Sequence, residues 1–422
     1  MAAALLDTLP LSRRQVDYVV NSTSMVNLAE GAIRSGKTAA SLLRWLIYVA
    51  DAPTGGALVM VGRTRDSLAR NVFGPLQDRG LFGDLARHVH YTPGAASGTI
   101  LGRTVHVFGA SDAKAEPVIR GLTVAGAYVD ELTVVSRDFF RQLLGRMSVE
   151  GAQLFATTNP DTPTHWVRRD YLDRLDELPE WRTWRFTLDD NPSLSSRMRE
   201  RYRRMYTGLW YRRYILGEWV AAEGAVYEAW DPARHVVDDL PPITRWLGAG
   251  VDYGTTNPFV ALLLGLGEDG RLYLAREWRH DSQRERRQLT DPEYSAALRG
   301  WLSSLADELD ARPEWVFVDP SAASFSLQLY RDGMTNVAHA INDVLPGIRT
   351  VAGLLARDRL RVHRSCTGWI TEVPGYSWDD TATARGEDKP VKMADHSLDA
   401  GRYVIHSTAH VWAPLLGEEV AI

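Results

Sequence analysis

The chain has 422 residues, of which 45% are hydrophobic and 24% charged, and a formal net charge of −5. This composition is that of a globular protein long enough for two domains. The small negative charge excludes a surface coated with basic patches but leaves room for a local nucleic-acid groove, and no apolar run is long enough to span a bilayer. The single cysteine, Cys366, excludes a disulfide framework within the chain, and the first residues lack the pattern of a secretory signal, so we expect a cytoplasmic protein.

The first half of the chain alternates short apolar runs with helical patterns. A helix is predicted over residues 38–50. Strands are predicted at residues 25–29, 57–61, 104–108, 125–129 and 153–157. Strands separated by helices predict an α/β domain whose mostly parallel sheet is covered on both faces.

A glycine-rich motif lies between the first predicted strand and the first predicted helix. Residues 31–38 read Gly-Ala-Ile-Arg-Ser-Gly-Lys-Thr and match the phosphate-binding loop G-x-x-x-x-G-K-[ST] in full. Such a loop surrounds phosphates with backbone N–H groups at a helix amino end, while its lysine reaches the β- and γ-phosphates and its last hydroxyl binds Mg²⁺. The residues expected to bind ATP are Gly31, Arg34, Ser35, Gly36, Lys37 and Thr38.

Two adjacent acids end the predicted strand at residues 125–129. Asp130 is expected to position Mg²⁺ and Glu131 to activate the attacking water. The alternative is a strand that merely ends in solvent with two acids. The phosphate-binding loop upstream favours ATP hydrolysis.

Other polar residues are candidates for contacts with the nucleotide. Thr158 and Asn159 follow the next strand, where they are placed to sense the γ-phosphate, and Gln15 precedes the first strand as a candidate for the adenine edge. Arg34 and Arg120 are candidates for an arginine finger, the former within its own subunit and the latter on a neighbouring subunit. The alternatives are a plain Asn-Pro turn and exposed polar side chains.

The sequence changes in character after residue 191. An Arg-rich helical segment spans residues 193–206, and Pro232 and the pair Pro241-Pro242 follow it. We predict a first domain over residues 1–221, with an Arg-rich lid and linker part from about residue 165, then a linker over 222–244 and a second domain over 245–422. In the second domain, strands are predicted at residues 250–253, 259–266, 271–275 and 315–319, a loop at 379–389 and a helix at 392–406.

The second half contains acids at the ends of predicted strands and on the late helix. Asp252 and Asp319 belong to the strands, whereas Asp395, His396 and Asp399 share the helix and, by their spacing, neighbouring positions on its surface. Acids from two strands and a helix can converge to hold two divalent ions that activate water for phosphodiester cleavage, and all-oxygen ligands favour Mg²⁺ or Mn²⁺. The alternative is that each acid caps a helix, forms a turn or lies in solvent.

Taken in order, these motifs resemble those of the large terminase subunit of tailed phages. The resemblance rests on the phosphate-binding loop, the acidic pair, Thr157-Thr-Asn-Pro160, Tyr214-Ile-Leu-Gly-Glu-Trp219, Gly224-Ala-Val-Tyr227, Asp252, Asp319 and Asp395-His-Ser-Leu-Asp-Ala-Gly-Arg-Tyr403. It implies a P-loop ATPase domain followed by an RNase H-like (RuvC-type) α/β nuclease domain. Asp252, Asp319 and Asp399 would then bind two Mg²⁺ or Mn²⁺ ions, assisted by His396 or Asp395.

The resemblance also implies an activity and partners. An ATPase would translocate double-stranded DNA into a prohead, and an endonuclease would cut the concatemer. The partners implied are the portal protein, the small terminase subunit and further copies of the chain in a ring, in the host-cell cytoplasm and without a membrane. Candidate contacts to DNA phosphates are the arginines of residues 197–213, Arg284, Arg286, Arg287 and Lys389.

Two other functions remain compatible with the residues. One is an ATP-dependent helicase or remodelling enzyme whose second domain binds nucleic acid without cutting it. The other is a scaffold that uses ATP only for assembly, which the acids Asp130 and Glu131 disfavour.

Overall fold

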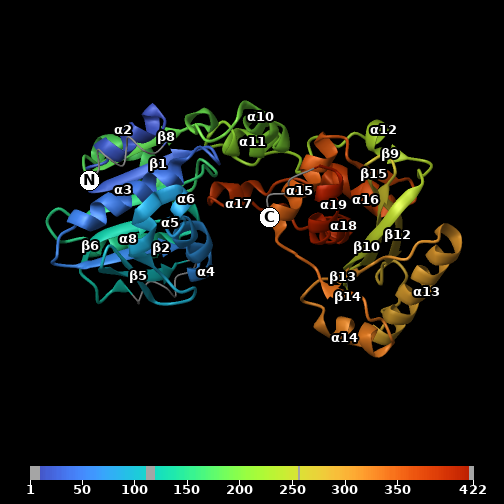
Figure 1. The fold of residues 1–422 in the computed structure, drawn as a ribbon. Helices are drawn as coiled ribbons and strands as arrows, with labels where there is room; N and C mark the ends of the chain where they lie inside the picture. Colours follow the sequence, from blue (N-terminus) through green and yellow to red (C-terminus); the bar gives the residue numbers. More distant parts are fainter. Residues whose placement is uncertain (1–9, 111–118, 255–256, 418–422) are drawn as a thin grey trace. The chain divides into compact units, whose positions relative to one another are not determined.

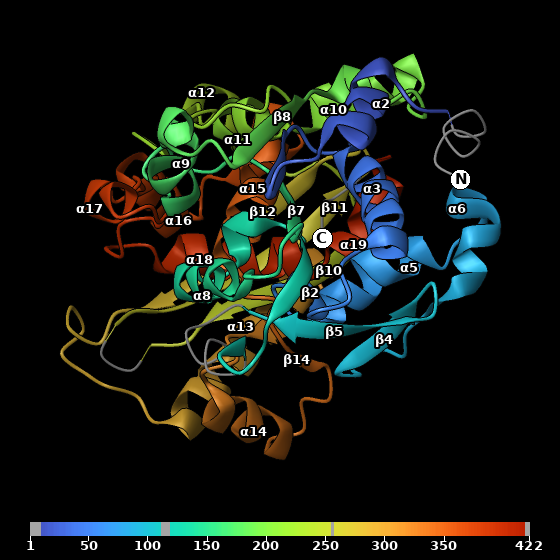
Figure 2. The same ribbon diagram turned by 90° about the vertical axis from the view of Figure 1, so that its left-hand side faces the viewer.

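The computed structural model describes residues 10–110, 119–254 and 257–417. The chain divides into two compact units, the first made of residues 1–221 with 384–387 and the second of residues 222–383 with 388–422. Figures 1 and 2 show the helices and strands of each unit. Within the described ranges, no helix has the length and apolar character needed to cross a membrane.

The described part of unit 1 is built on a sheet of eight strands. In sheet order these are β3 (Val89–His90), β4 (Ser97–Ile100), β5 (Arg103–Gly109), β2 (Ala57–Gly62), β6 (Val124–Val129), β7 (Gln153–Thr158), β1 (Val26–Gly31) and β8 (Trp181–Phe186). The six strands from β5 to β8 pair in parallel, whereas β3, β4 and β5 are antiparallel. The mostly parallel α/β sheet expected from the sequence is therefore confirmed.

Helices cover both faces of this sheet. The α-helices in the described part of unit 1 are α2 (Arg13–Asn21), α3 (Lys37–Asp51), α4 (Arg65–Leu68), α5 (Gly74–Leu76), α6 (Arg79–Phe82), α8 (Arg137–Arg146), α9 (Trp166–Asp170), α10 (Ser196–Met205) and α11 (Gly208–Tyr214). The strand pleat sends alternate side chains into two cores. Tyr128 packs with Trp45 of α3, and its neighbour Val129 packs with Phe139 of α8. Figure 2 shows α3 and α8 on opposite sides of the sheet.

Unit 2 is also an α/β unit, with a mixed sheet of seven strands among its described residues. The order is β14 (Val337–His339), β13 (Val316–Val318), β10 (Ile243–Asp252), β11 (Phe259–Gly267), β12 (Leu272–His280), β15 (Leu360–His363) and β9 (Val236–Val237). Strands β10, β11 and β12 are antiparallel, and the outer strands pair in parallel.

The described part of the second half also contains a set of α-helices. They are α12 (Pro232–His235), α13 (Asp291–Leu309), α14 (Ala323–Arg331), α15 (Val344–Ala356), α16 (Thr367–Glu372), α17 (Asp380–Ala384), α18 (His396–Ser407) and α19 (Ala409–Leu415). Figure 1 shows α18 and α13 on opposite sides of β10 and β12. Val251 packs in the core with Tyr294 of α13, whereas its neighbour Gly250 faces α18.

Several elements differ from the sequence-based expectations. The late helix begins at His396 instead of residue 392, so Asp395 is its N-cap residue and not part of the helix, although Lys392 contacts both Asp395 and Asp399. The segment 379–389, expected to be a loop, contains α17. Strand β8 pairs with β1 although no strand was expected there, because three of its six residues, Arg182, Thr183 and Arg185, carry a charge or a hydroxyl.

Candidate functional site

The phosphate-binding loop connects the carboxyl end of β1 to the amino end of α3. Gly31, the last residue of β1, has a φ of 128°, and a Cβ there would lie 2.0 Å from the Phe186 carbonyl oxygen of β8. Gly36 has a φ of 83° immediately before Lys37, the first residue of α3. Both glycines are therefore required by backbone geometry and close approach. Arg34 also adopts a positive φ, 53°, which is strained for a residue with a side chain.

The carbonyl groups of this loop are held by amide side chains from outside it. Gln15 donates from Nε2 to the Gly36 carbonyl oxygen at 3.2 Å, and Asn191 donates from Nδ2 to the Arg34 carbonyl oxygen at 2.7 Å. Gln15 is buried and its side-chain oxygen accepts from the Ser12 N–H. The structure thus places Gln15 against the loop backbone, and its adenine contact stays a prediction. Asn191 supports the loop through this contact, a role that the sequence analysis did not predict.

A continuous polar path joins the loop lysine to the acid expected to activate water. Lys37 donates from Nζ to Asn159 Oδ1 at 2.6 Å, and Asn159 donates from Nδ2 to both oxygens of Glu131, at 2.8 and 3.0 Å. Burial lowers the pKa of Lys37, while the charges of Glu131 and Asp130 oppose that shift. The start of α3 and the ends of β6 and β7 therefore bring Lys37, Glu131 and Asn159 together.

Asp130 lies beside this path and is buried. It accepts a hydrogen bond from Thr157 Oγ1 at 3.2 Å, and the Glu131 N–H donates to the same hydroxyl. Burial, with repulsion from Glu131, raises the pKa of Asp130 to about 7. Such a carboxyl gains from a nearby cation, because burial without one disfavours its charged form. Glu131 has a φ of 51°, and strain of this kind concentrates at functional positions.

The other residues predicted to bind the nucleotide lie outside the contact path from Lys37 through Asn159 to Glu131. Thr158 donates to the Thr133 hydroxyl at 3.1 Å, in the turn after Glu131. Thr38 is half-buried in the first turn of α3, and the Ser35 hydroxyl is buried without a hydrogen-bond partner among the described residues. Arg34 and Arg120 are exposed.

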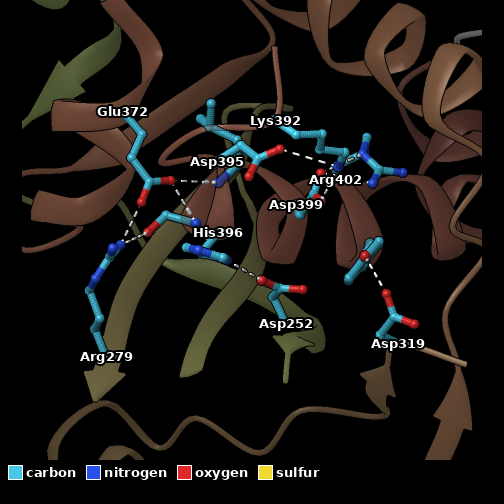
Figure 3. A network of polar contacts seen from close by, with 12 residues as sticks. Asp252, Arg279, Asp319, Glu372, Lys392, Asp395, His396, Asp399 and Arg402 are labelled. Carbon is cyan, nitrogen blue, oxygen red and sulfur yellow. Dashed lines mark hydrogen bonds and ion pairs between the residues drawn. The ribbon is translucent and has the colours of Figure 1, made fainter. Parts of the chain in front are cut away.

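In unit 2 the expected acids lie around α18 (Figure 3). Asp252 ends β10, Asp319 follows β13 and Asp399 lies in the first turn of α18. Helix and strand touch at Gly250, where a Cβ would lie 2.1 Å from the Ala400 carbonyl oxygen. This contact brings the end of β10 next to the first turn of α18, because only glycine permits so close an approach.

Each of these acids has a partner within the protein. His396 Nδ1 lies 2.9 Å from Asp252, and the Tyr403 hydroxyl donates to Asp319 at 2.5 Å. Asp399 accepts from Arg402 at 2.8 Å. Lys392 lies between two carboxylates, 3.1 Å from Asp399 and 3.2 Å from Asp395.

The charges of Asp399 and Asp319 act on both Asp252 and Tyr403. Burial raises the pKa of Asp252, and the charges of Asp399 and Asp319 raise it further, against His396. Burial alone would raise the pKa of Asp319, but hydrogen bonds, chiefly from Tyr403, outweigh it and lower that pKa. Burial raises the pKa of Tyr403, and the charges of Asp399, Asp252 and Asp319 all add to the shift. The three carboxylates therefore share one electrostatic neighbourhood.

This donor set suits a divalent cation in its chemistry, since it consists of carboxylates that repel one another. Across residues 10–110, 119–254 and 257–417, however, no three His, Cys, Asp or Glu side chains are arranged to hold one ion. The carboxylates are engaged by His396, Tyr403, Arg402 and Lys392 instead. Binding of a cation would require side chains to exchange these partners.

The arginine candidates for DNA contact differ in accessibility. Arg213 is only 2% exposed, is paired with Asp161 and donates to the Val220 carbonyl oxygen, so it supports the local fold. Arg203 of α10 pairs with Asp189, and Arg287 pairs with Glu293 on the surface of unit 2. Surface pairs of this kind are weak enough to be exchanged for phosphate.

These features define a class: a P-loop NTPase fold of the α/β type, followed by a second α/β unit with an acidic centre. The family model "Terminase large subunit, T4likevirus-type, N-terminal" matches residues 28–231. A structure of the large terminase from a thermophilic bacteriophage is 37% identical, with a TM-score of 0.82, and the match covers 94% of this chain and 98% of that chain. The chain belongs to the large terminase family.

Two further structures of the same thermophilic phage enzyme contain nucleotide. The complex with ADP matches with a TM-score of 0.83 at 37% identity, and the complex with ATP-γ-S with a TM-score of 0.81 at 36% identity. Each covers 94% of this chain and 99% of that chain. A comparison with curated proteins gives no match. The resemblance inferred from the ordered motifs is confirmed by the structural relatives.

Proposed function

We propose that this chain is the motor of viral DNA packaging, which hydrolyses ATP to move double-stranded DNA into a prohead and cuts the concatemeric genome. The observation that carries the proposal is the contact path from Lys37 through Asn159 to Glu131. It joins a phosphate-binding group to a carboxylate suited to activate water. The large terminase of the thermophilic bacteriophage, similar over nearly the whole chain, has been crystallised with ADP and with ATP-γ-S.

In this proposal the site residues of unit 1 have different roles in ATP hydrolysis. Lys37 and the N–H groups of the loop hold the β- and γ-phosphates, while Thr38 and Asp130 hold the Mg²⁺ that accompanies ATP. That ion offsets the phosphate charge when bound. Glu131 orients the attacking water, and Asn159 senses the γ-phosphate because it bonds to both Lys37 and Glu131.

The transition-state charge requires a further positive group. Arg34 lies in the loop itself and would act within one subunit, whereas the exposed Arg120 would reach the nucleotide of a neighbouring subunit. The second arrangement requires the homo-oligomeric ring implied by the family. Both residues stay candidates in this proposal.

The second half of the proposal is a metal-dependent endonuclease in unit 2. Asp252, Asp319 and Asp399 would hold two Mg²⁺ or Mn²⁺ ions, with His396 or Asp395 assisting. Such ions activate water and stabilise the leaving oxygen of a phosphodiester. The mutual repulsion of the three carboxylates around Tyr403 supports this assignment.

The domain assignment follows from the two activities. We assign residues 1–221 to the motor, including the Arg-rich lid and linker part from about residue 165, residues 222–244 to the linker and residues 245–422 to the nuclease. The partners proposed are double-stranded DNA, the portal protein and the small terminase subunit, at the portal vertex in the host-cell cytoplasm. Contacts to DNA would go mainly to phosphates, since a packaging motor must ignore sequence.

One experiment tests the ATPase assignment and a second distinguishes the nuclease from a helicase. Glu131→Gln is expected to bind ATP normally and to hydrolyse it at least about a hundredfold more slowly, because the amide cannot take a proton from water. Normal turnover would move the base elsewhere. With Mn²⁺, the parent chain should linearise plasmid DNA; strand displacement on forked duplexes without any cutting would favour the helicase alternative.

A further inference from the structure

The amino end of α18 carries two of the groups proposed for the nuclease site, His396 and Asp399. His396 is its first residue, Asp399 lies one turn on and Tyr403 a turn further. The first N–H groups of any helix lack partners within the helix and need an acceptor from outside. The residue before α18, Asp395, supplies none from its side chain.

The acceptor comes from a different helix, α16. Glu372, its last residue, accepts from the Ser397 N–H at 2.7 Å and from the Leu398 N–H at 3.3 Å, both through Oε2. Its side chain is buried. A carboxylate at this position satisfies two free donors and places a negative charge at the positive end of the helix.

Glu372 is held in place from strand β12, as Figure 3 shows. Arg279 donates from Nη1 to Glu372 Oε1 at 2.6 Å and to the Ser397 hydroxyl at 2.9 Å. The Ser397 hydroxyl in turn donates to Glu277 at 2.5 Å. A Cβ at Gly368 would lie 2.4 Å from both Glu277 Oε1 and Ser397 Oγ, so the chain leaves room for this network.

The network consists of the buried carboxylate of Glu372, the half-buried carboxylate of Glu277 and one arginine, a combination that desolvation makes costly. Burial raises the pKa of Glu372, and Arg279 opposes the shift. None of its carboxylates belongs to the proposed catalytic set. The network ends at Ser397. This residue directly follows His396, whose Nδ1 contacts Asp252.

We propose that Glu372 is a positioning residue of the nuclease site: through Ser397 and Leu398 it fixes the amino end of α18, so that His396 meets Asp252 and Asp399 faces the same centre. This inference rests on the proposed nuclease function. A purely stabilising cap would leave the acids free to adjust locally. If Glu372 positions the helix, its loss also weakens the binding of a cation by those acids.

The test is Glu372→Gln in the full chain. Glutamine can accept through one oxygen only, so its NH₂ group must face either Arg279 or the helix N–H groups. The matched control is Glu308→Gln, because Glu308 accepts from Arg276 of the same strand at 2.7 Å but lies on α13. A rescue variant adds Arg279→Gln, whose amide oxygen can accept from Gln at position 372.

Mn²⁺ affinity is measured by calorimetry without nucleotide, with Asp252→Ala as the baseline, and plasmid cutting and melting are followed in parallel. For Glu372→Gln we expect a Kd for Mn²⁺ raised about tenfold and a cutting rate lowered at least as much. The KM for DNA and the ATPase rate should not change. Glu308→Gln should stay within about twofold of the parent, and the rescue variant should recover part of the loss.

Parental Mn²⁺ affinity and cutting in Glu372→Gln would overturn the inference, as would a lower melting temperature with unchanged Mn²⁺ affinity. If Glu372→Gln does not fold, Ser397→Ala decides the matter, since it keeps the backbone donors but loses the hydroxyl contacts. An affinity of Ser397→Ala for Mn²⁺ that is about threefold lower than in the parent supports the inference, and an unchanged affinity overturns it. If the parent chain itself neither binds Mn²⁺ nor cuts, the proposed nuclease function fails and this inference falls with it.

Discussion

Asn159 donates its amide hydrogens to both carboxylate oxygens of Glu131 while its own carbonyl oxygen accepts from Lys37. One side chain thereby holds the group expected to activate water and the group expected to hold the γ-phosphate. When Lys37 moves to phosphate, Asn159 loses a partner at 2.6 Å, and its hold on Glu131 can change. The contact therefore links nucleotide binding to the orientation of Glu131, the proposed base.

Replacing Asn159 should therefore affect turnover more than binding. For Asn159→Ala we expect ATP hydrolysis to fall at least about tenfold, since about 1.4 kcal/mol of transition-state stabilisation corresponds to that factor. The Kd for ATP should change less than about threefold. Turnover is measured by phosphate release and binding by a fluorescent ATP analogue.

Asn21→Ala provides the control for the loss of an amide, because the Asn21 side chain bonds only to Asp17 on the surface of α2 among the hydrogen bonds described. It should hydrolyse ATP like the parent. Equal losses of binding and turnover in Asn159→Ala would show that Asn159 supports the loop without acting on Glu131.

The position of the arginine finger can be tested by mixing subunits. Arg120→Ala and Lys37→Ala chains are each expected to be inactive alone. If Arg120 acts on a neighbouring subunit, a mixture regains ATPase activity, because an intact loop in one subunit meets an intact arginine from the next. A mixture that stays inactive at concentrations where the chains assemble would favour Arg34 in the same subunit.

The contact between Gly250 and Ala400 predicts a local intolerance of side chains. Gly250→Ala should lower the free energy of unfolding of unit 2 by about 1–3 kcal/mol, because the added methyl overlaps the helix backbone. Gly300→Ala is the control: it lies in α13 with no atom within 4 Å of the added Cβ. It should be neutral or stabilising by up to about 1 kcal/mol. Thermal melting distinguishes the two, and equal melting temperatures would contradict the close approach.

Buried histidines predict a loss of stability in acid. Burial lowers the pKa of His235 and of His406, so both stay neutral in the folded chain. The unfolded chain binds protons at these residues near pH 6.5, so stability falls as the pH drops below that value. Each contributes up to about 1.4 kcal/mol by pH 5.5.

The measurement is thermal or urea unfolding between pH 7.5 and 5.5. His235→Gln should flatten the acid side of the curve, whereas His90→Gln, at an exposed position, should not. Parallel curves for all three chains would exclude His235 as a source of the acid sensitivity.

Much of the fold could be predicted from the sequence because local patterns determine it. Apolar runs identified β1, β2, β6 and β7, and the phosphate-binding loop identified the turn between β1 and α3. Strand β8 could not be predicted, because its pairing with β1 depends on the sheet and its sequence, Trp-Arg-Thr-Trp-Arg-Phe, is neither an apolar run nor a strict alternation of apolar and polar residues. The start of α18 depends on Glu372, which is distant in sequence, so the helical period alone placed it too early.

The candidate sites likewise contain some residues that the sequence predicts and others that only the tertiary structure identifies. Motifs named Lys37, Glu131 and Asp252, because fixed spacing and strand ends predict them. The supporting contacts of Asn191 and Glu372 arise from tertiary packing, and no sequence pattern predicts them. The roles of the catalytic and metal-binding candidates remain predictions until they are measured.

The central claim, that one chain hydrolyses ATP and cuts DNA at separate sites, is tested most directly by measuring both activities in two variants. Lys37→Ala should lose ATP hydrolysis and still cut plasmid DNA with Mn²⁺, whereas Asp252→Ala should lose cutting and still hydrolyse ATP. The contradicting result is an Asp252→Ala chain that cuts like its parent, or a Lys37→Ala chain that hydrolyses ATP like its parent.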